Sequence, residues 1–140
     1  MTEPIYTTEI LRLAASLQEP KTLEREDGRA EVRSPTCGSL IKLAVHVNDD
    51  RRILAVSQQV QACAFGQASA ALVELHAGGR NHAEIAEAMV ALSRWLAQER
   101  EDAGDWPGVA ALEPARSRAG RHGAILLPFR ALLSAMEDAR

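Results

Sequence analysis

The first half of the chain contains short runs in which apolar and polar residues alternate, which is the period of a strand that buries one face. The clearest run spans 41–47, and its apolar positions are Ile41, Leu43, Val45 and Val47. A polar turn over 48–52 and a second run over 53–61 complete a hairpin, and a weaker run over 24–33 indicates an edge strand. We therefore expect a small antiparallel sheet in this half of the chain.

Elsewhere apolar residues recur every three or four positions, which predicts helices with one buried face. These segments span 7–18, 66–75, 81–99 and 125–138. Asn81 and Glu84 have the spacing of a capping box at the start of the third segment. Pro128 fits the fourth segment if it lies in the first turn, where its missing N–H costs no hydrogen bond. The intervening residues 100–123 contain turn-forming Pro and Gly, so we expect a surface loop with one helical turn.

The composition fits a single globular domain over residues 1–140 in which helices dominate. A chain of 140 residues has the usual length of one domain, and 46% of its residues are hydrophobic while 25% are charged. Aromatic residues make up only 4% of the chain. The core must therefore be built from aliphatic side chains and alanine, which suits closely packed helices.

The charge balance and the apolar runs argue against two classes of partner. Sixteen basic and nineteen acidic side chains give a net charge of −3, which offers no general attraction for the phosphates of nucleic acid. The apolar runs are too short to cross a bilayer, and residues 1–6 lack the basic and apolar stretches of a signal peptide. We expect a cytoplasmic protein that binds neither nucleic acid nor membranes.

The two cysteines are the first candidates for chemistry. Cys37 lies just before the strand over 41–47, and Cys63 lies where the strand over 53–61 leads into a helix. In a reducing compartment, thiols bind metals or take part in catalysis more often than they form disulfides. Because a hairpin separates the two cysteines, we expect it to bring both sulfur atoms within reach of one ion.

The segments around these cysteines resemble the U-type iron-sulfur cluster assembly scaffolds, also described as NifU-like N-terminal domains. The shared features are Pro-x-Cys-Gly at 35–38, a hairpin, Ala-Cys-x-x-Gly-x-Ala-Ser at 62–69 and a C-terminal helix opened by an apolar turn, in that order. The resemblance implies an α+β fold, in which helices cover a three-stranded antiparallel sheet. It also implies an iron-sulfur cluster or zinc at one end, a cysteine desulfurase and apo iron-sulfur proteins as partners, and a homodimer as one oligomeric state.

The ligand set that the resemblance implies is incomplete in this chain. Members of the family hold metal with three cysteines and one aspartate, and Cys37 and Cys63 match two of the cysteines. The aspartate position holds Ser39, and the third cysteine position falls at Ala124. A methyl group cannot coordinate a metal, and a neutral hydroxyl is a weak replacement for a carboxylate. We therefore expect a labile cluster or zinc, or no bound metal at all.

Two further features lie just before Ala124. His122 is two residues away, and an imidazole can replace cysteine as a ligand of zinc or iron. It can equally be the solvated end of the basic loop that precedes it. Arg116, Arg118 and Arg121 make that loop basic, which indicates either a docking face for an acidic partner or an ordinary solvated surface.

Three functions remain open at this point. The first is a scaffold or carrier without enzymatic turnover, in which iron and sulfur assemble on Cys37 and Cys63 and pass to an apoprotein; in a dimer, two such pairs supply four thiolates. The second is a regulatory partner of sulfur mobilisation that has kept the fold and binds no cluster. The third is a sulfur relay in which Cys63 accepts a persulfide. We favour the first because both thiols stand at the matching positions.

Overall fold

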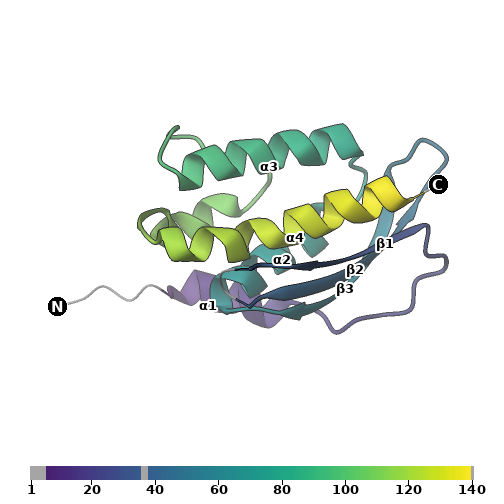
Figure 1. Ribbon diagram of the computed structural model, residues 1–140, viewed down its shortest axis with the longest axis horizontal. Coiled ribbons are helices and arrows are strands. Elements are labelled where there is room, and N and C mark those ends of the chain that lie inside the picture. The colour runs from purple at the N-terminus through teal and green to yellow at the C-terminus, as the bar shows by residue number, and fades with distance from the viewer. Residues whose placement is uncertain (1–5, 36–37, 140) are drawn as a thin grey trace.

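The computed structural model describes residues 6–35 and 38–139, which form a sheet covered on one face by helices (Figure 1). The strands are β1 (Gly28–Arg33), β2 (Leu40–Val47) and β3 (Ile53–Gln61), and they pair antiparallel in the order β1-β2-β3. The helical elements are α1 (Thr8–Ser16), α2 (Ala64–His76), α3 (His82–Leu96), the 3-10 helix η1 (Val109–Ser117) and α4 (Ala119–Asp138). The predicted α+β class and the three-stranded antiparallel sheet are confirmed.

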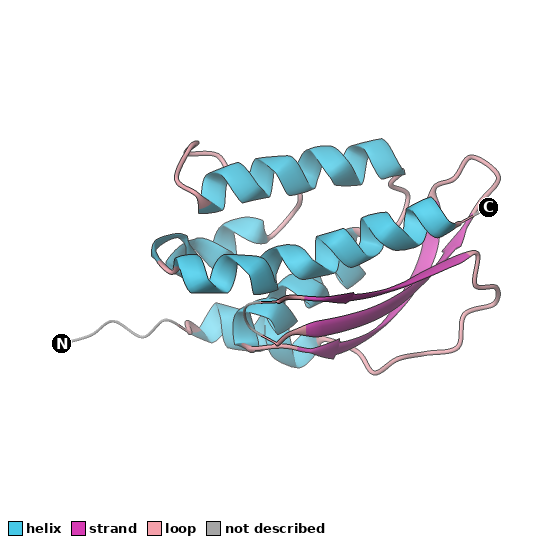
Figure 2. Cartoon of the chain, viewed as in Figure 1, coloured by secondary structure: helices cyan, strands magenta, loops and turns pink. Residues whose placement is uncertain are grey.

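The helices form two levels above the sheet. Helix α2 packs on β3, and α4 packs on β1 and β2. Helix α3 lies beside α4 on the side away from the sheet, and α1 packs against α2 (Figure 2). Strand β3 ends, α3 ends and α4 begins at the same end of the molecule (Figure 1). No helix in the described part of the chain is long and apolar enough to cross a membrane.

The alternating pattern of β2 fixes the register of the sheet. Its predicted inward residues are buried, with Ile41 and Val45 fully inaccessible to solvent. Leu43 pairs with Ala30 of β1 and with Gln58 of β3, so the inward positions of all three strands line up. A one-residue slip would turn every one of these side chains to the polar face.

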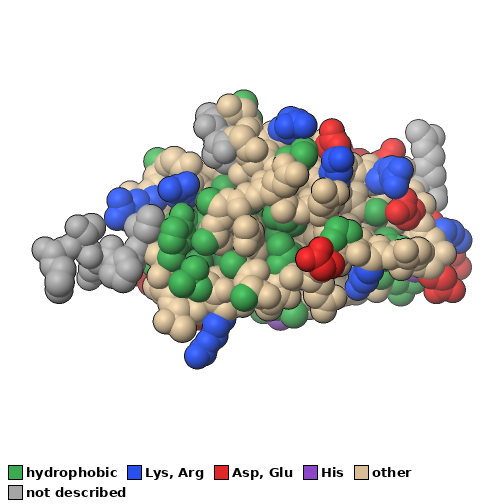
Figure 3. All heavy atoms as spheres, turned by 90° about the horizontal axis from the view of Figure 1, so that it is seen from below, with side chains coloured by type: hydrophobic (Ala, Val, Ile, Leu, Met, Phe, Trp, Pro, Cys, Tyr) green, Lys and Arg blue, Asp and Glu red, His purple; other side chains and the backbone are tan. Residues whose placement is uncertain are grey.

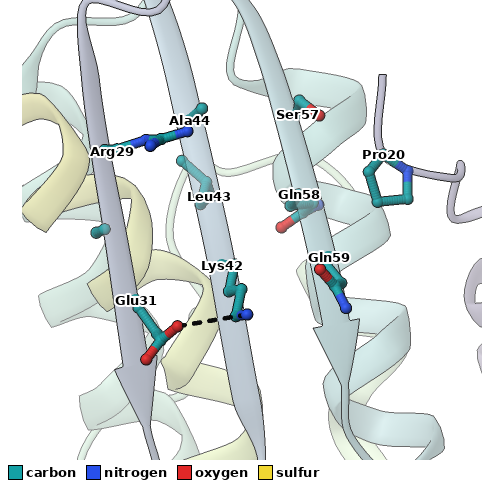
Figure 4. A pocket seen from close by; sticks show the side chains of 10 residues that line it. Pro20, Arg29, Glu31, Lys42, Leu43, Ala44, Ser57, Gln58 and Gln59 are labelled. Carbon is teal, nitrogen blue, oxygen red and sulfur yellow. Dashed lines mark ion pairs between the residues drawn. The ribbon is translucent and has the colours of Figure 1, made fainter. Parts of the chain in front are cut away.

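The outer face of the sheet is polar and carries no helix. Glu31 and Lys42 lie opposite each other on neighbouring strands, and their side chains form an ion pair of 3.6 Å (Figure 4). Together with Pro20, Ser57 and other residues they line a shallow hollow of about 500 Å³. The charges on this face are paired and solvated, which is the usual state of the open face of an antiparallel sheet.

The predictions for the C-terminal region were partly wrong. Helix α4 begins at Ala119, so Pro128 lies inside it rather than in its first turn. The predicted surface loop contains the whole of η1 and the buried Trp106, which is only 2% exposed. The indole N–H of Trp106 donates to the carbonyl of Leu72 at 3.0 Å, and its ring packs edge-on against Phe129. Trp106 and the buried residues of η1 are therefore part of the core.

Candidate functional site

Cys63 lies between β3 and α2, at the N-cap position of the helix. Its side chain makes no capping hydrogen bond and is partly exposed. The backbone on both sides is held in place, because the N–H of Gln67 donates to the carbonyl of Cys63 and the side-chain amide of Gln67 donates to the carbonyl of Ala62, both at 2.9 Å. The thiol is thus presented on a fixed backbone without being used to stabilise the helix.

The start of β2, which follows the other predicted thiol in sequence, lies beside the end of β3. Leu40 pairs with Gln61, so Ser39 and Cys63 stand at the same end of neighbouring strands. The N–H of Ser34 donates to the carbonyl of Ser39 at 2.9 Å. Ser39, at the predicted aspartate position, is only 4% exposed. Cys37 itself lies outside the described residues, so the distance between the two thiols remains a prediction.

Ala124, at the predicted position of the third cysteine, lies against the first turn of α2. A Cβ atom built on Gly66 would come within 3.5 Å of the Ala124 methyl group and within 2.6 Å of the Ala62 Cβ. The hydroxyl of Ser69 donates to the carbonyl of Ile125 at 2.6 Å, which fixes α4 on α2 at this point. Ala124 is 1% exposed. The fold therefore brings this position close to the helix that starts at Cys63, but it carries a buried methyl group.

His122 points one ring nitrogen at η1. Its Nε2 lies 2.8 Å from the carbonyl oxygen of Ala115. A carbonyl can only accept, so Nε2 donates this bond, and Nδ1 is the ring nitrogen that the bond does not use. Metal-binding histidines are commonly oriented by such a bond through the second nitrogen. The residues that the structure describes nevertheless contain no group of three His, Cys, Asp or Glu side chains that could hold a metal ion.

Comparison with known proteins identifies the family. Residues 5–102 match the NifU-like N-terminal domain. This chain belongs to that family. A nitrogen-fixing NifU-like protein (N-terminal) from Brucella abortus has a crystal structure that is 28% identical in sequence, with a TM-score of 0.87 over 96% of this chain and 93% of that chain.

Two other solved structures support the fold of this NifU-like domain. A putative iron-sulfur cluster assembly scaffold protein for the SUF system from Fervidobacterium islandicum AW-1 is 20% identical, with a TM-score of 0.83 over 94% of this chain and 96% of that chain. A hypothetical protein solved at 2.3 Å is 22% identical, with a TM-score of 0.66 over 92% of this chain and 96% of that chain. No curated protein matches this chain.

The arginines of the predicted docking face differ in their surroundings in this NifU-like domain. Arg116 donates to the carbonyls of Trp95 and Arg100 at 2.8 and 3.1 Å, and its guanidinium lies over the Trp95 ring. Arg116 thus joins η1 to the end of α3. Arg118 is exposed and Arg121 is partly buried, so Arg118 is the most accessible of the three to a partner.

Helix α2 of this NifU-like domain is held by buried polar side chains that the sequence analysis did not single out. The amide of Gln58 donates to the carbonyl of Ala70 at 2.7 Å, and Trp106 donates to Leu72 two residues further on. Gln58 is 2% exposed, and its Oε1 has no hydrogen-bond partner among the described residues. A sequence signal for Gln58 exists, since it is a polar residue at an inward position of the alternating pattern of β3.

Proposed function

We propose that this NifU-like domain acts in iron-sulfur cluster assembly as a scaffold or carrier that holds iron or a cluster on Cys63 and Cys37 as cargo. The observation that supports this most directly is the placement of Cys63. Its thiol is partly exposed, makes no capping bond and stands on a backbone fixed by Gln67. The N-terminus of α2 also favours negative charge, which suits a thiolate bound to iron.

The ligand set suits temporary binding better than permanent storage. Two thiolates leave coordination positions on iron open, and neither Ser39 nor Ala124 supplies a carboxylate or thiolate. We propose His122 Nδ1 as a further donor, because its other nitrogen is already held by Ala115. In this role a cysteine desulfurase supplies sulfur and apo iron-sulfur proteins accept the cluster, while zinc competes for the same thiolates.

One observation favours a second candidate function. Ala124 is buried against Gly66, so the end of the molecule where the family's third cysteine falls is closed by apolar packing. A buried methyl group at this position is compatible with a protein that has kept the fold and the partner surface but assembles no cluster. In that case the chain regulates sulfur mobilisation by binding a partner.

Anaerobic reconstitution with iron and sulfide tests the first proposal. We expect a coloured product with thiolate-to-iron charge-transfer absorbance in the wild-type protein, and a loss of that absorbance in C63S and in C37S. H122A should lower iron retention, whereas H76A, which removes an imidazole at the far end of α2, should retain iron like the wild type. Circular dichroism checks that all variants are folded.

The colour of the reconstituted protein, together with two further assays, distinguishes the three functions. A colourless wild-type product contradicts the scaffold proposal. If the colourless protein still binds a desulfurase, and C37S/C63S binds it equally well, the regulatory function is supported. If incubation with desulfurase and cysteine in the absence of iron adds one sulfur atom to Cys63 by mass spectrometry, the sulfur relay is supported.

A further inference from the structure

Helices α1 and α3 begin at a residue whose side chain accepts a free N–H group of the first turn, and α2 does not. Thr7 accepts the N–H of Ile10 at 3.1 Å, and Asn81 accepts the N–H of Glu84 at 2.9 Å. Cys63 occupies the same N-cap position on α2, but its side chain makes no such bond. Because sulfur is a weak acceptor, a cysteine at this position holds the first turn less firmly than a threonine or an asparagine does.

The side chain of Gln67 closes this first turn instead. Gln67 is the fourth residue of α2, and its Nε2 donates to the carbonyl of Ala62, the residue before the N-cap, at 2.9 Å. Its backbone N–H donates to the carbonyl of Cys63, also at 2.9 Å. Many helices join the residue before the N-cap to the fourth helical residue by an apolar contact. Here a hydrogen bond joins the same two positions, and both residues that lead into α2 are tied to Gln67.

Packing holds Ala62 in the same place as this hydrogen bond does. A Cβ atom built on Gly66 would lie 2.6 Å from the Ala62 Cβ, so the Ala62 methyl group lies directly against the backbone of Gly66. Gln67 is partly buried, which limits the competition of water for its amide. The entry of the chain into α2 is therefore fixed at Ala62, by one hydrogen bond and one close contact that do not involve the side chain of Cys63.

We propose that Gln67 is a positioning residue for the Cys63 thiol, because its side-chain amide replaces the helix cap that Cys63 does not supply. A serine or threonine at position 63 would turn its oxygen to the first N–H groups of α2 and would no longer present it to a ligand. With the first turn closed by Gln67, the thiol keeps its lone pairs for cargo. This role rests on the proposed function for the cargo that the thiol holds, whereas the link between Gln67 and residue 63 can be measured without metal.

Amide hydrogen exchange of the metal-free protein tests this link. Q67M keeps the length of the side chain and removes the donor, so the backbone N–H at position 67 should exchange about fivefold faster, the scale of one lost hydrogen bond. The second half of α2 should exchange as in the wild type. In C63S the serine caps the first turn, so adding Q67M should change the exchange there by less than about twofold.

The dependence on residue 63 separates this role from a merely structural one, because a purely structural bond to Ala62 would have the same effect in both backgrounds. Q59M is the matched control, since Gln59 is exposed on the outer face of β3 (Figure 4). It should leave the exchange at position 67 unchanged. Equal acceleration by Q67M in the wild-type and C63S backgrounds overturns the proposal, as does no acceleration in either.

Anaerobic loading with iron and sulfide tests the consequence for the cargo. Q67M should retain iron about tenfold less tightly than the wild type, the lower end of the effect of losing a residue that orients a metal ligand. Q59M should retain iron like the wild type, and competition with a chelator measures both. If Q67M retains iron as tightly as a coloured wild type, the positioning role is wrong and the scaffold function stands. A colourless wild type contradicts the scaffold function instead, and the exchange measurements still decide whether Gln67 replaces the cap.

Discussion

Asp27 and Cys63 lie at opposite ends of the molecule, and their side chains differ in the hydrogen bonds that they make. At the hairpin end, Asp27 accepts hydrogen bonds from the N–H of Val47 at 2.8 Å and from His46 at 2.9 Å, and it also pairs with Arg25. Nearby, the side chain of Asn48 accepts two backbone N–H groups of its own turn. At the other end, Cys63 makes no capping bond. Asp27 is thus fully used in holding the strands, whereas the partly exposed Cys63 thiol does not cap its helix.

The difference extends to packing and to the surface. Close to Cys63 the helices meet through small residues, since a Cβ at Gly66 would clash with Ala62 at 2.6 Å and lie 3.3 Å from the carbonyl of Ala124. On the face seen in Figure 3, most acidic side chains lie in the half of the molecule away from the N-terminus, which is the hairpin half. Close packing around Gly66 therefore contributes to stability at the Cys63 end.

The largest expected effect comes from giving the Cys63 end the polar ligands that it lacks. In S39D/A124C a carboxylate and a thiol replace a hydroxyl and a methyl group at the two family positions. Because losing even an outer-shell partner typically costs 10- to 100-fold in metal affinity, two added ligands should strengthen iron retention by at least about 100-fold. Competition with a chelator after anaerobic loading measures this change.

The matched control for this prediction is S134A/A131C, which introduces the same cysteine further along α4. It should retain iron like the wild type. Unchanged retention in S39D/A124C would mean that these positions no longer point at a shared site, and would favour the regulatory function.

The next effect concerns packing at the same end. G66A adds a methyl group that would lie 2.6 Å from the Ala62 Cβ and 3.5 Å from the Ala124 Cβ. Since Ala62 or the start of α2 must shift to admit it, and the carbonyl of Ala124 is crowded at 3.3 Å, we expect a loss of about 1–3 kcal/mol in the free energy of unfolding, measured with denaturant. G120A is the control, because no atom lies within 4 Å of a Cβ built there. Equal stability of the two variants would contradict the close packing of Gly66 against Ala62.

The parts of the fold that the sequence predicted well are those whose pattern is local. The apolar alternation of β2 fixes both its period and its register, because a shift by one residue would expose Ile41 and Val45. The capping box of Asn81 and Glu84 is equally local, and the structure contains both of its hydrogen bonds. The Cys63 motif could be placed for the same reason, since it directly follows a recognisable strand.

The parts that could not be predicted depend on contacts between distant segments. The first five residues of α4 include Gly120 and Gly123, which favour no helix on their own. This segment forms where His122 is tied to Ala115 of η1, a contact that no local pattern reveals. Trp106 lies in a segment rich in turn-forming residues, yet its partners Leu72 and Phe129 lie far away in sequence. Local preference therefore indicated a loop where packing produces core.

The smallest effect is confined to acidic pH and to the hairpin end. The N–H of Val47, His46 and Arg25 lower the pKa of Asp27 from 3.8 to about 2. A carboxylate whose pKa is lowered by folding contributes stability in full above its unfolded pKa, and this contribution is lost as the pH falls through the folded pKa. D27N should therefore be less stable than the wild type at pH 6, and the difference should shrink as the pH falls from about 4 through about 2 and disappear only below that pH. Denaturant unfolding at a series of pH values measures it, with D49N on the neighbouring turn as the control that follows the wild type. A difference that persists undiminished at pH 2 would mean that the Asp27 carboxylate charge does not hold β1 to β2, and the contrast between the two ends would then rest on packing alone.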